Sequence, residues 1–344
     1  YTVIWLRLPG HGTTPCALAD LSWKDWTAAV EIAMCGLRDQ LPEDAPLLLG
    51  GYSNGGALSV NYGLSAIEDP SLPKPDAVVL FSPMIGINPM AKITRLYHMV
   101  TRVTGNTKAQ WSSIQAEIDP FKYSSWPMNA NVQAWAVTQS VERKLAAMKK
   151  AGRLDEMAPV LAMQSVVDST VVVPKLITVL FDRLSSTLSE LVLFDINRDD
   201  WLGNLFNLSF ESQIVPKLKR TDLPYQLTVV SNKHTKTDRV CVQSRDGECW
   251  VERETELAWP DGVVSLSHVA VTIPPVDRIY GTADATSDTG FSLGSISMRG
   301  EPAALLISDS VFVRCRHNPF YEFMEDYVVE WLTEVLGAKS SGSN

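Results

Sequence analysis

The sequence predicts an α/β fold in which helices cover a mostly parallel sheet. Short apolar runs bounded by turn residues recur along the chain, and helical patterns separate them. The 344 residues are 45% hydrophobic, which is enough for a sizeable core. The predicted strands lie at 2–8, 46–52, 77–81, 160–164 and 190–195.

The first of these runs begins at the first residue, because Tyr1 opens a strand pattern that ends at Leu8 and no initiator Met precedes it. We therefore expect an N-terminal portion, including strands of the sheet, to precede this sequence in the whole protein.

The first helix is predicted after Ser22. Ser22 and Asp25 form a capping-box pattern, in which each side chain binds the backbone amide of the other residue. Apolar residues then follow at helical spacing until Pro42. They are Trp26, Val30, Ala33 and Leu37. This pattern predicts a buried amphipathic helix with a structural role.

A Gly-x-Ser-x-Gly pattern lies between a strand pattern at 47–49 and a helix pattern at 57–67. Its residues are Gly51-Tyr52-Ser53-Asn54-Gly55. A sharp turn from strand to helix lifts the serine hydroxyl out of the sheet, and the two glycines keep the neighbouring backbone free of clashes. Ser53 is therefore the predicted nucleophile. The backbone amide of Asn54 is the predicted oxyanion donor, because it lies at a helix N-terminus.

The predicted acid is Asp168. It ends the apolar run 159–168, and the C-terminal end of a parallel strand lies at the same sheet edge as Ser53. A structural alternative is that Asp168 only caps a helix beginning near Val172. Competing acids follow the next strand, at Asp195, Asp199 and Asp200.

A serine nucleophile also needs a base, and a histidine held by an acid is the usual one. The five histidines are His11, His98, His234, His268 and His317. In this architecture the chain order is nucleophile, acid, base. That order leaves three candidates open, namely His234, His268 and His317.

The strand pattern stops between residues 89 and 158, where we expect an inserted helical cap. The expected core therefore has a first part at 1–88 and a second part at 159–344, the latter with an insertion at about 198–262. The insertion contains a strand pattern at 226–231 and a hairpin turn at Asp246-Gly247. Large apolar residues of the cap either pack within it or face a substrate cleft. They are Met90, Leu96, Met99, Trp111, Trp126 and Met128.

These motifs resemble the α/β-hydrolase superfamily, in particular bacterial carboxylesterases, monoacylglycerol lipases and lysophospholipase-like proteins. The resemblance covers most of the chain. The segments that carry it are Leu8-Pro9-Gly10-His11-Gly12, Gly51-Tyr52-Ser53-Asn54-Gly55, Phe81-Ser82-Pro83, Ser165-Val166-Val167-Asp168, Ser267-His268-Val269 and Pro274-Pro275.

The resemblance implies an α/β-hydrolase sheet and the catalytic triad Ser53, Asp168 and His268, with His234 as the alternative base. The predicted insertion accounts for the 100 positions between Asp168 and His268. A second oxyanion donor is expected from residues before Tyr1.

The expected function is hydrolysis of an acyl ester, and the apolar cap favours a hydrophobic acyl group as substrate. A peptidase, a thioesterase and an inactive ligand-binding relative are the alternatives. No cofactor or metal is expected, because no His or Cys pair has metal-ligand spacing. A net charge of -9 argues against nucleic acid as a partner. No apolar run reaches the roughly 18 residues that a membrane-spanning helix needs.

Overall fold

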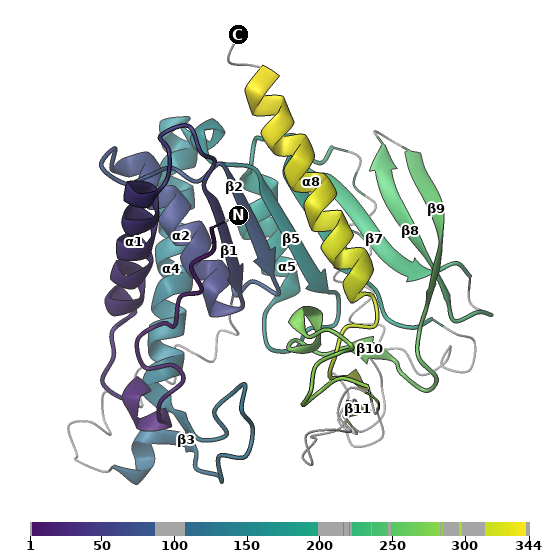
Figure 1. The fold of residues 1–344 in the computed structure, drawn as a ribbon, viewed down its shortest axis with the longest axis horizontal. Helices are drawn as coiled ribbons and strands as arrows, with labels where there is room; N and C mark the ends of the chain where they lie inside the picture. Colours follow the sequence, from purple (N-terminus) through teal and green to yellow (C-terminus); the bar gives the residue numbers. More distant parts are fainter. Residues whose placement is uncertain are drawn as a thin grey trace.

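The structure is a computed structural model that describes residues 2–86, 107–198, 222–234, 236–246, 249–282 and 314–341, together with residues 216, 220, 284 and 296–297. Within these residues a seven-stranded sheet has the order β1-β2-β5-β6-β7-β8-β9 (Figure 1). Neighbouring strands from β1 to β7 are parallel, whereas β8 and β9 are added antiparallel. The predicted α/β class with a mostly parallel sheet is confirmed.

The main sheet is formed by β1 (Leu48–Tyr52), β2 (Ala77–Phe81), β5 (Val160–Ser165), β6 (Glu190–Phe194), β7 (Gln226–Asn232), β8 (Arg239–Asp246) and β9 (Cys249–Ala258). Short strands form two smaller sheets, β3 (Trp111–Ser113) with β4 (Trp126–Pro127), and β10 (Ser265–Leu266) with β11 (Ile296–Ser297) and β12 (Arg314–Cys315). The α-helices are α1 (Trp23–Gln40), α2 (Asn54–Glu68), α4 (Met128–Ala151), α5 (Val173–Lys175) and α8 (Tyr321–Ser341).

Both faces of the sheet are buried, and strand alternation decides which core each side chain joins. On β2, Val78 and Leu80 join residues of α2 and α4, while Ala77 and Val79 join residues of α8. The sheet is therefore the middle of three layers, with α8 crossing in front of it in Figure 1.

Helix α1 begins and ends where the sequence predicts. Both hydrogen bonds of the capping box form, and one of them is the Ser22 amide donating to Asp25 Oδ2 at 2.8 Å. Trp26 and Val30 are buried as expected. Met34 is also buried, whereas Ala33, one of the predicted apolar positions, is half-buried.

The prediction of a strand at 2–8 is wrong. This segment forms no strand, and Val3 and Trp5 are 74% and 93% exposed. A strand needs a neighbour to accept and donate its backbone hydrogen bonds, and among the described residues none pairs with this segment. The other four predicted strands correspond to β1, β2, β5 and β6.

The predicted strand at 226–231 is β7, and a hairpin of β8 and β9 follows it. Asp246 pairs with Cys249 at the end of this hairpin. Strand β9 is the edge of the sheet, and its exposed face carries Glu252, Glu254 and Glu256.

Helix α4 packs against α2 in a contact that includes polar side chains. Ser140 Oγ donates to Asn61 Oδ1 at 2.9 Å, and Val141 and Leu145 enter the same core as the sheet. The cap at 89–158, the division of the core and the insertion at about 198–262 stay predictions. Met90, Leu96 and Met99 lie outside the described residues, while Trp111 and Trp126 lie on the paired strands β3 and β4.

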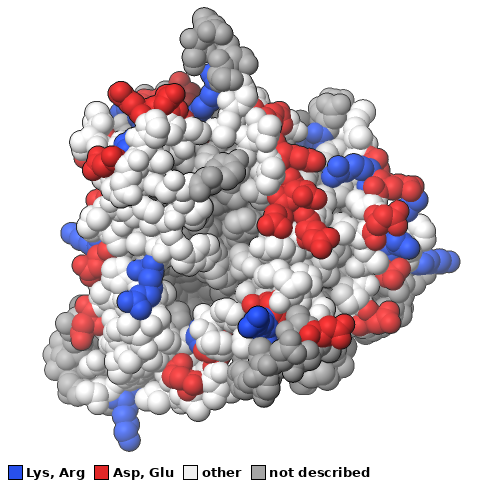
Figure 2. All heavy atoms as spheres, in the orientation of Figure 1, with Lys and Arg blue, Asp and Glu red and all other residues white. Residues whose placement is uncertain are grey.

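The solvent-exposed face of α8 is acidic. Red side chains gather over this helix in Figure 2, and α8 exposes Glu322, Glu325, Asp326, Glu330 and Glu334. A negative surface repels phosphate groups. In the part of the chain that the structure describes, no helix is both long and apolar enough to span a bilayer.

A carboxylate joins the sheet to α8. The hydroxyls of Thr228, on β7, and Tyr327, on α8, both donate to Glu190 Oε1 of β6, at 2.6 and 2.5 Å. Burial nevertheless raises the pKa of Glu190, because desolvation of the charged form outweighs these two hydrogen bonds. The folded protein therefore binds a proton at Glu190 more readily than the unfolded chain does.

We expect Glu190→Gln to stabilise the protein at neutral pH. A raised pKa means that the stability contributed by Glu190 is present below its unfolded pKa and is lost as pH rises through the folded pKa. The amide keeps an oxygen to accept both hydroxyls and carries no charge. Thermal unfolding should show a Tm about 2 °C higher at pH 7 and no gain below about pH 4. An equal gain at both pH values would contradict this account of Glu190.

Candidate active site

Ser53 lies at the turn between β1 and α2, in a backbone conformation that is rare for a residue with a side chain. Its φ is 51° and its ψ is -115°. Two hydrogen bonds hold the turn, with the Ser53 amide donating to Phe81 O at 3.0 Å and the Met84 amide donating to Ser53 O at 2.9 Å. The end of β2 therefore fixes the predicted nucleophile in this strained conformation.

The glycines around Ser53 are not equivalent. A Cβ on Gly51 would lie 2.3 Å from Gly55 O, and one on Gly56 would lie 2.7 Å from Pro83 Cβ. A Cβ on Gly55 would meet no atom within 4 Å. The expectation that both flanking glycines prevent clashes therefore holds at Gly51 and is wrong at Gly55, where Gly56 takes that role.

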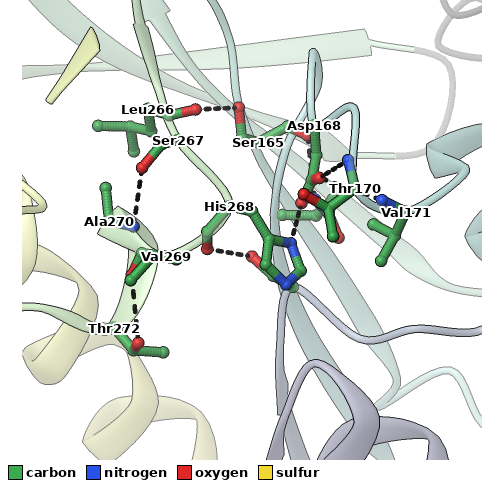
Figure 3. Close-up of polar contacts among 12 residues, drawn as sticks. Ser165, Asp168, Thr170, Val171, Leu266, Ser267, His268, Val269, Ala270 and Thr272 are labelled. Atoms are coloured by element: carbon green, nitrogen blue, oxygen red, sulfur yellow. Dashed lines mark hydrogen bonds and ion pairs between the residues drawn. The ribbon is translucent and has the colours of Figure 1, made fainter. Parts of the chain in front are cut away.

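Asp168 lies just after β5 and is almost fully buried, with a relative exposure of 5%. Its Oδ1 accepts the amides of Thr170, at 2.8 Å, and Val171, at 3.2 Å. Its Oδ2 accepts Gln164 Nε2 at 2.9 Å. The same oxygen faces His268 Nδ1 at 2.5 Å (Figure 3). These four contacts use the full acceptor capacity of a carboxylate. One oxygen therefore holds the turn at 168–171, while the other faces His268. The alternative that Asp168 caps the next helix is wrong, because α5 has Val172 as its N-cap and no side-chain cap hydrogen bond.

His268 follows β10 and is 7% exposed. Its ring points at the Asp168 carboxylate in Figure 3. Its backbone oxygen accepts a long hydrogen bond of 3.4 Å from Ser82 Oγ. Ser82 lies at the end of β2 with a φ of 43°. The same short segment therefore contacts both Ser53 and His268.

The other candidate histidines lie elsewhere. His234 is exposed on a turn after β7, where its Nδ1 accepts the Lys236 amide at 3.3 Å. His317 is buried, and its Nδ1 donates to the backbone oxygen of Tyr280 at 3.1 Å. The ring of His11 packs edge-on against Trp26. His98 lies outside the described residues.

The competing acid Asp195 is occupied by other partners. Arg198 Nε lies 2.5 Å from Asp195 Oδ2, and Ser231 Oγ donates to the same oxygen at 2.8 Å. Asp199 and Asp200 lie outside the described residues. Among the described candidates, the structure brings Asp168 and His268 together and leaves Asp195 and His234 apart from them.

Tyr52 connects the nucleophile turn to His268. Its ring lies 5.2 Å from the His268 ring, centroid to centroid. Burial, followed by the nearby Asp168 carboxylate and Tyr280, raises the pKa of Tyr52. Tyr52 therefore remains a neutral phenol beside the imidazole.

Gln164 was missed by the sequence analysis. It is fully buried on β5, and its Nε2 donates to Asp168 Oδ2 and to Ser165 O. The available signal was an amide within an otherwise apolar strand, four positions before the predicted acid.

Asn54 is the first residue of α2, so its backbone amide has no acceptor within the helix. This amide points out of the N-terminal end of the helix, where negative charge is stabilised. Over the described ranges, no group of three or more His, Cys, Asp or Glu residues is arranged to hold a metal ion.

Comparison with known proteins gives one family. The profile of the family described as serine aminopeptidase, S33, matches residues 1–196, more than half of the chain. A metagenome-derived lipolytic enzyme is 22% identical, with a TM-score of 0.42 over 62% of this chain and 80% of its own. A soluble variant of monoglyceride lipase from Saccharomyces cerevisiae, in complex with a substrate analog, is 14% identical. Its TM-score is 0.37, and the match covers 54% of this chain and 66% of the lipase chain. No curated protein matches the sequence.

The packing of the turn predicts opposite outcomes for two neighbouring glycines. Gly51→Ala would push a methyl group into the Gly55 backbone, and we expect a loss of about 3 kcal/mol or more in the free energy of unfolding. Gly55→Ala, the matched control, should be neutral or stabilise by up to about 1 kcal/mol, because alanine favours a helix. Urea unfolding of both variants would measure this difference. Equal losses would show that the turn is not packed as described.

Proposed function

The chain belongs to the α/β-hydrolase family described as serine aminopeptidase, S33, and on this basis we propose that it is a serine hydrolase that cleaves acyl esters through an acyl-enzyme on Ser53. The observation that carries the proposal is the contact of 2.5 Å between Asp168 Oδ2 and His268 Nδ1. This contact leaves the other ring nitrogen of His268 available as a base, next to a turn that presents a serine.

In the first half of the reaction, Ser53 Oγ attacks the carbonyl carbon of the ester. His268 Nε2 takes the hydroxyl proton, and the resulting imidazolium is stabilised by Asp168. The amide of Asn54 donates to the oxyanion of the tetrahedral intermediate. The intermediate then collapses, the bond to the alcohol oxygen breaks, and His268 returns its proton to the leaving alcohol.

In the second half, water hydrolyses the acyl-enzyme. His268 Nε2 removes a proton from the water, whose oxygen attacks the acyl carbon, and the same oxyanion site is used again. The carboxylic acid leaves and Ser53 recovers its proton. The four hydrogen-bond contacts of Asp168 hold its carboxylate against the His268 ring in both halves of the reaction.

The proposed substrate is a hydrophobic acyl ester. Its support is the apolar composition of the segment predicted as a cap, where Trp111 and Trp126 are half-buried. The family description favours a second candidate, an aminopeptidase that uses the same three residues. The two candidates differ in whether the enzyme prefers p-nitrophenyl acyl esters or aminoacyl p-nitroanilides.

The nucleophile is tested by Ser53→Ala. We expect the variant to lose labelling by a fluorophosphonate probe and to hydrolyse p-nitrophenyl butyrate at least about 10³-fold more slowly, because the covalent step is removed. Mass spectrometry of the labelled wild-type protein should place the adduct on Ser53. Equal hydrolysis by the two proteins, with no adduct on Ser53, would exclude the proposed mechanism.

The acid is tested by Asp168→Asn against Asp195→Asn. The first change leaves His268 without a carboxylate to hold its Nδ1 proton, and we expect kcat to fall by about 10⁴-fold. The second removes a carboxylate at the end of the next strand, which is held by Arg198 and Ser231. It should lower Tm while kcat stays within about twofold of the wild type. A larger loss of kcat from Asp195→Asn would identify Asp195 as the acid instead.

A further inference from the structure

We propose that Gln164 is a positioning residue that fixes the Asp168 carboxylate beneath His268. The inference rests on the proposed function, since it assigns a role to Gln164 in the same site. It goes beyond the triad, because Gln164 would act on the base only through the acid.

The Gln164 amide has one orientation that fits its surroundings. Its Nε2 has two protons, and two acceptors receive them, Asp168 Oδ2 at 2.9 Å and Ser165 O at 3.1 Å. Turning the amide over would place Oε1 against these two oxygens, which carry no proton to share. Gln164 therefore donates to the same carboxylate oxygen that faces His268.

The other end of the amide indicates that Gln164 is not required for stability. Its Oε1 is buried and has no hydrogen-bond partner. A buried acceptor without a partner destabilises the folded state, and an apolar side chain of the same shape would avoid that penalty. Val160 and Ala162 occupy the same face of β5 and are apolar. An amide at this position is therefore explained by its contact with Asp168.

The hydrogen bond from Gln164 would fix the orientation of the Asp168 carboxylate and reduce the negative charge that Oδ2 presents to His268. The backbone amides of Thr170 and Val171 hold Oδ1, so Gln164 is the second donor on the oxygen that His268 uses. By sharing the negative charge of Oδ2, Gln164 weakens its attraction for a proton on His268. It also restricts rotation of the carboxylate.

Two titratable side chains lie near the Asp168–His268 pair, and both are phenols. Tyr52 of β1 packs against the His268 ring, and Tyr280 is near Tyr52. Burial raises the pKa of both phenols, so both stay neutral at the pH values at which an imidazole titrates.

The test compares the wild type with Gln164→Met, which keeps the length of the side chain and removes the donor. Without this donor, Oδ2 attracts the imidazolium more strongly. In the pH profile of kcat/KM, the midpoint of the acid limb should therefore move to a pH about one unit higher. We expect kcat to fall about tenfold with KM unchanged, and Tm to stay equal or rise. The NMR resonance of the His268 Nδ1 proton, assigned with His268→Asn, should move downfield.

The matched control is Ser140→Ala, which removes a buried side-chain hydrogen bond to Asn61 between α4 and α2. It should lower Tm and leave both the acid limb and the Nδ1 resonance unchanged. If Gln164→Met does not fold, Gln164→Leu provides the same comparison. An unchanged resonance with an unchanged acid limb would overturn the positioning role.

Failure of the proposed function is distinguishable from failure of this inference. A wild-type protein that takes no fluorophosphonate label on Ser53 would reject the hydrolase proposal. The Nδ1 resonance of Gln164→Met would still decide whether Gln164 acts on the Asp168–His268 pair, because that signal does not depend on turnover.

Discussion

The contact between Asp168 and His268 joins parts of the chain that are 100 residues apart, and the arrangement of the site depends on it. Asp168 follows β5, in the middle of the parallel sheet, whereas His268 follows β10, which belongs to a separate small sheet. The β7–β8–β9 extension lies between them in sequence. This contact, together with the hydrogen bond from Ser165 Oγ to Leu266 O at 3.1 Å, holds the returning segment beside the end of β5. Ser53 joins this arrangement through the end of β2.

Local sequence signals predicted the parts of the fold in which local and tertiary preferences agree. The capping box at Ser22 predicted the start of α1, and four apolar runs predicted four parallel strands. The run at 2–8 has the same composition, yet Trp5 is exposed and forms no ladder. Strand composition shows only that a segment is suited to a sheet. A neighbouring strand has to supply the hydrogen bonds, and that information is not local.

The candidate site shows the same division. The strand and helix patterns around Ser53, and the strand that ends near Asp168, could be recognised from the sequence. Residue types and chain order alone left three histidines open as the base, since only the folded chain shows that His234 is solvent-exposed while His268 meets a carboxylate. Similarly, nothing local distinguishes Gly55 from Gly56. The difference arises because Pro83, from a separate segment, packs against Gly56.

The exposed glutamates of β9 have a consequence for the behaviour of the protein at high concentration. An edge strand carries free backbone groups that can recruit a strand from another molecule and begin fibrillar assembly. Glu252, Glu254 and Glu256 alternate along this edge. Lys233 pairs with Glu254 and Arg239 pairs with Glu256, so this edge strand presents charged groups of both signs, whose burial against a second strand would cost desolvation free energy. Among the described residues, the charged side chains of β9 therefore oppose its pairing with a second copy of the chain.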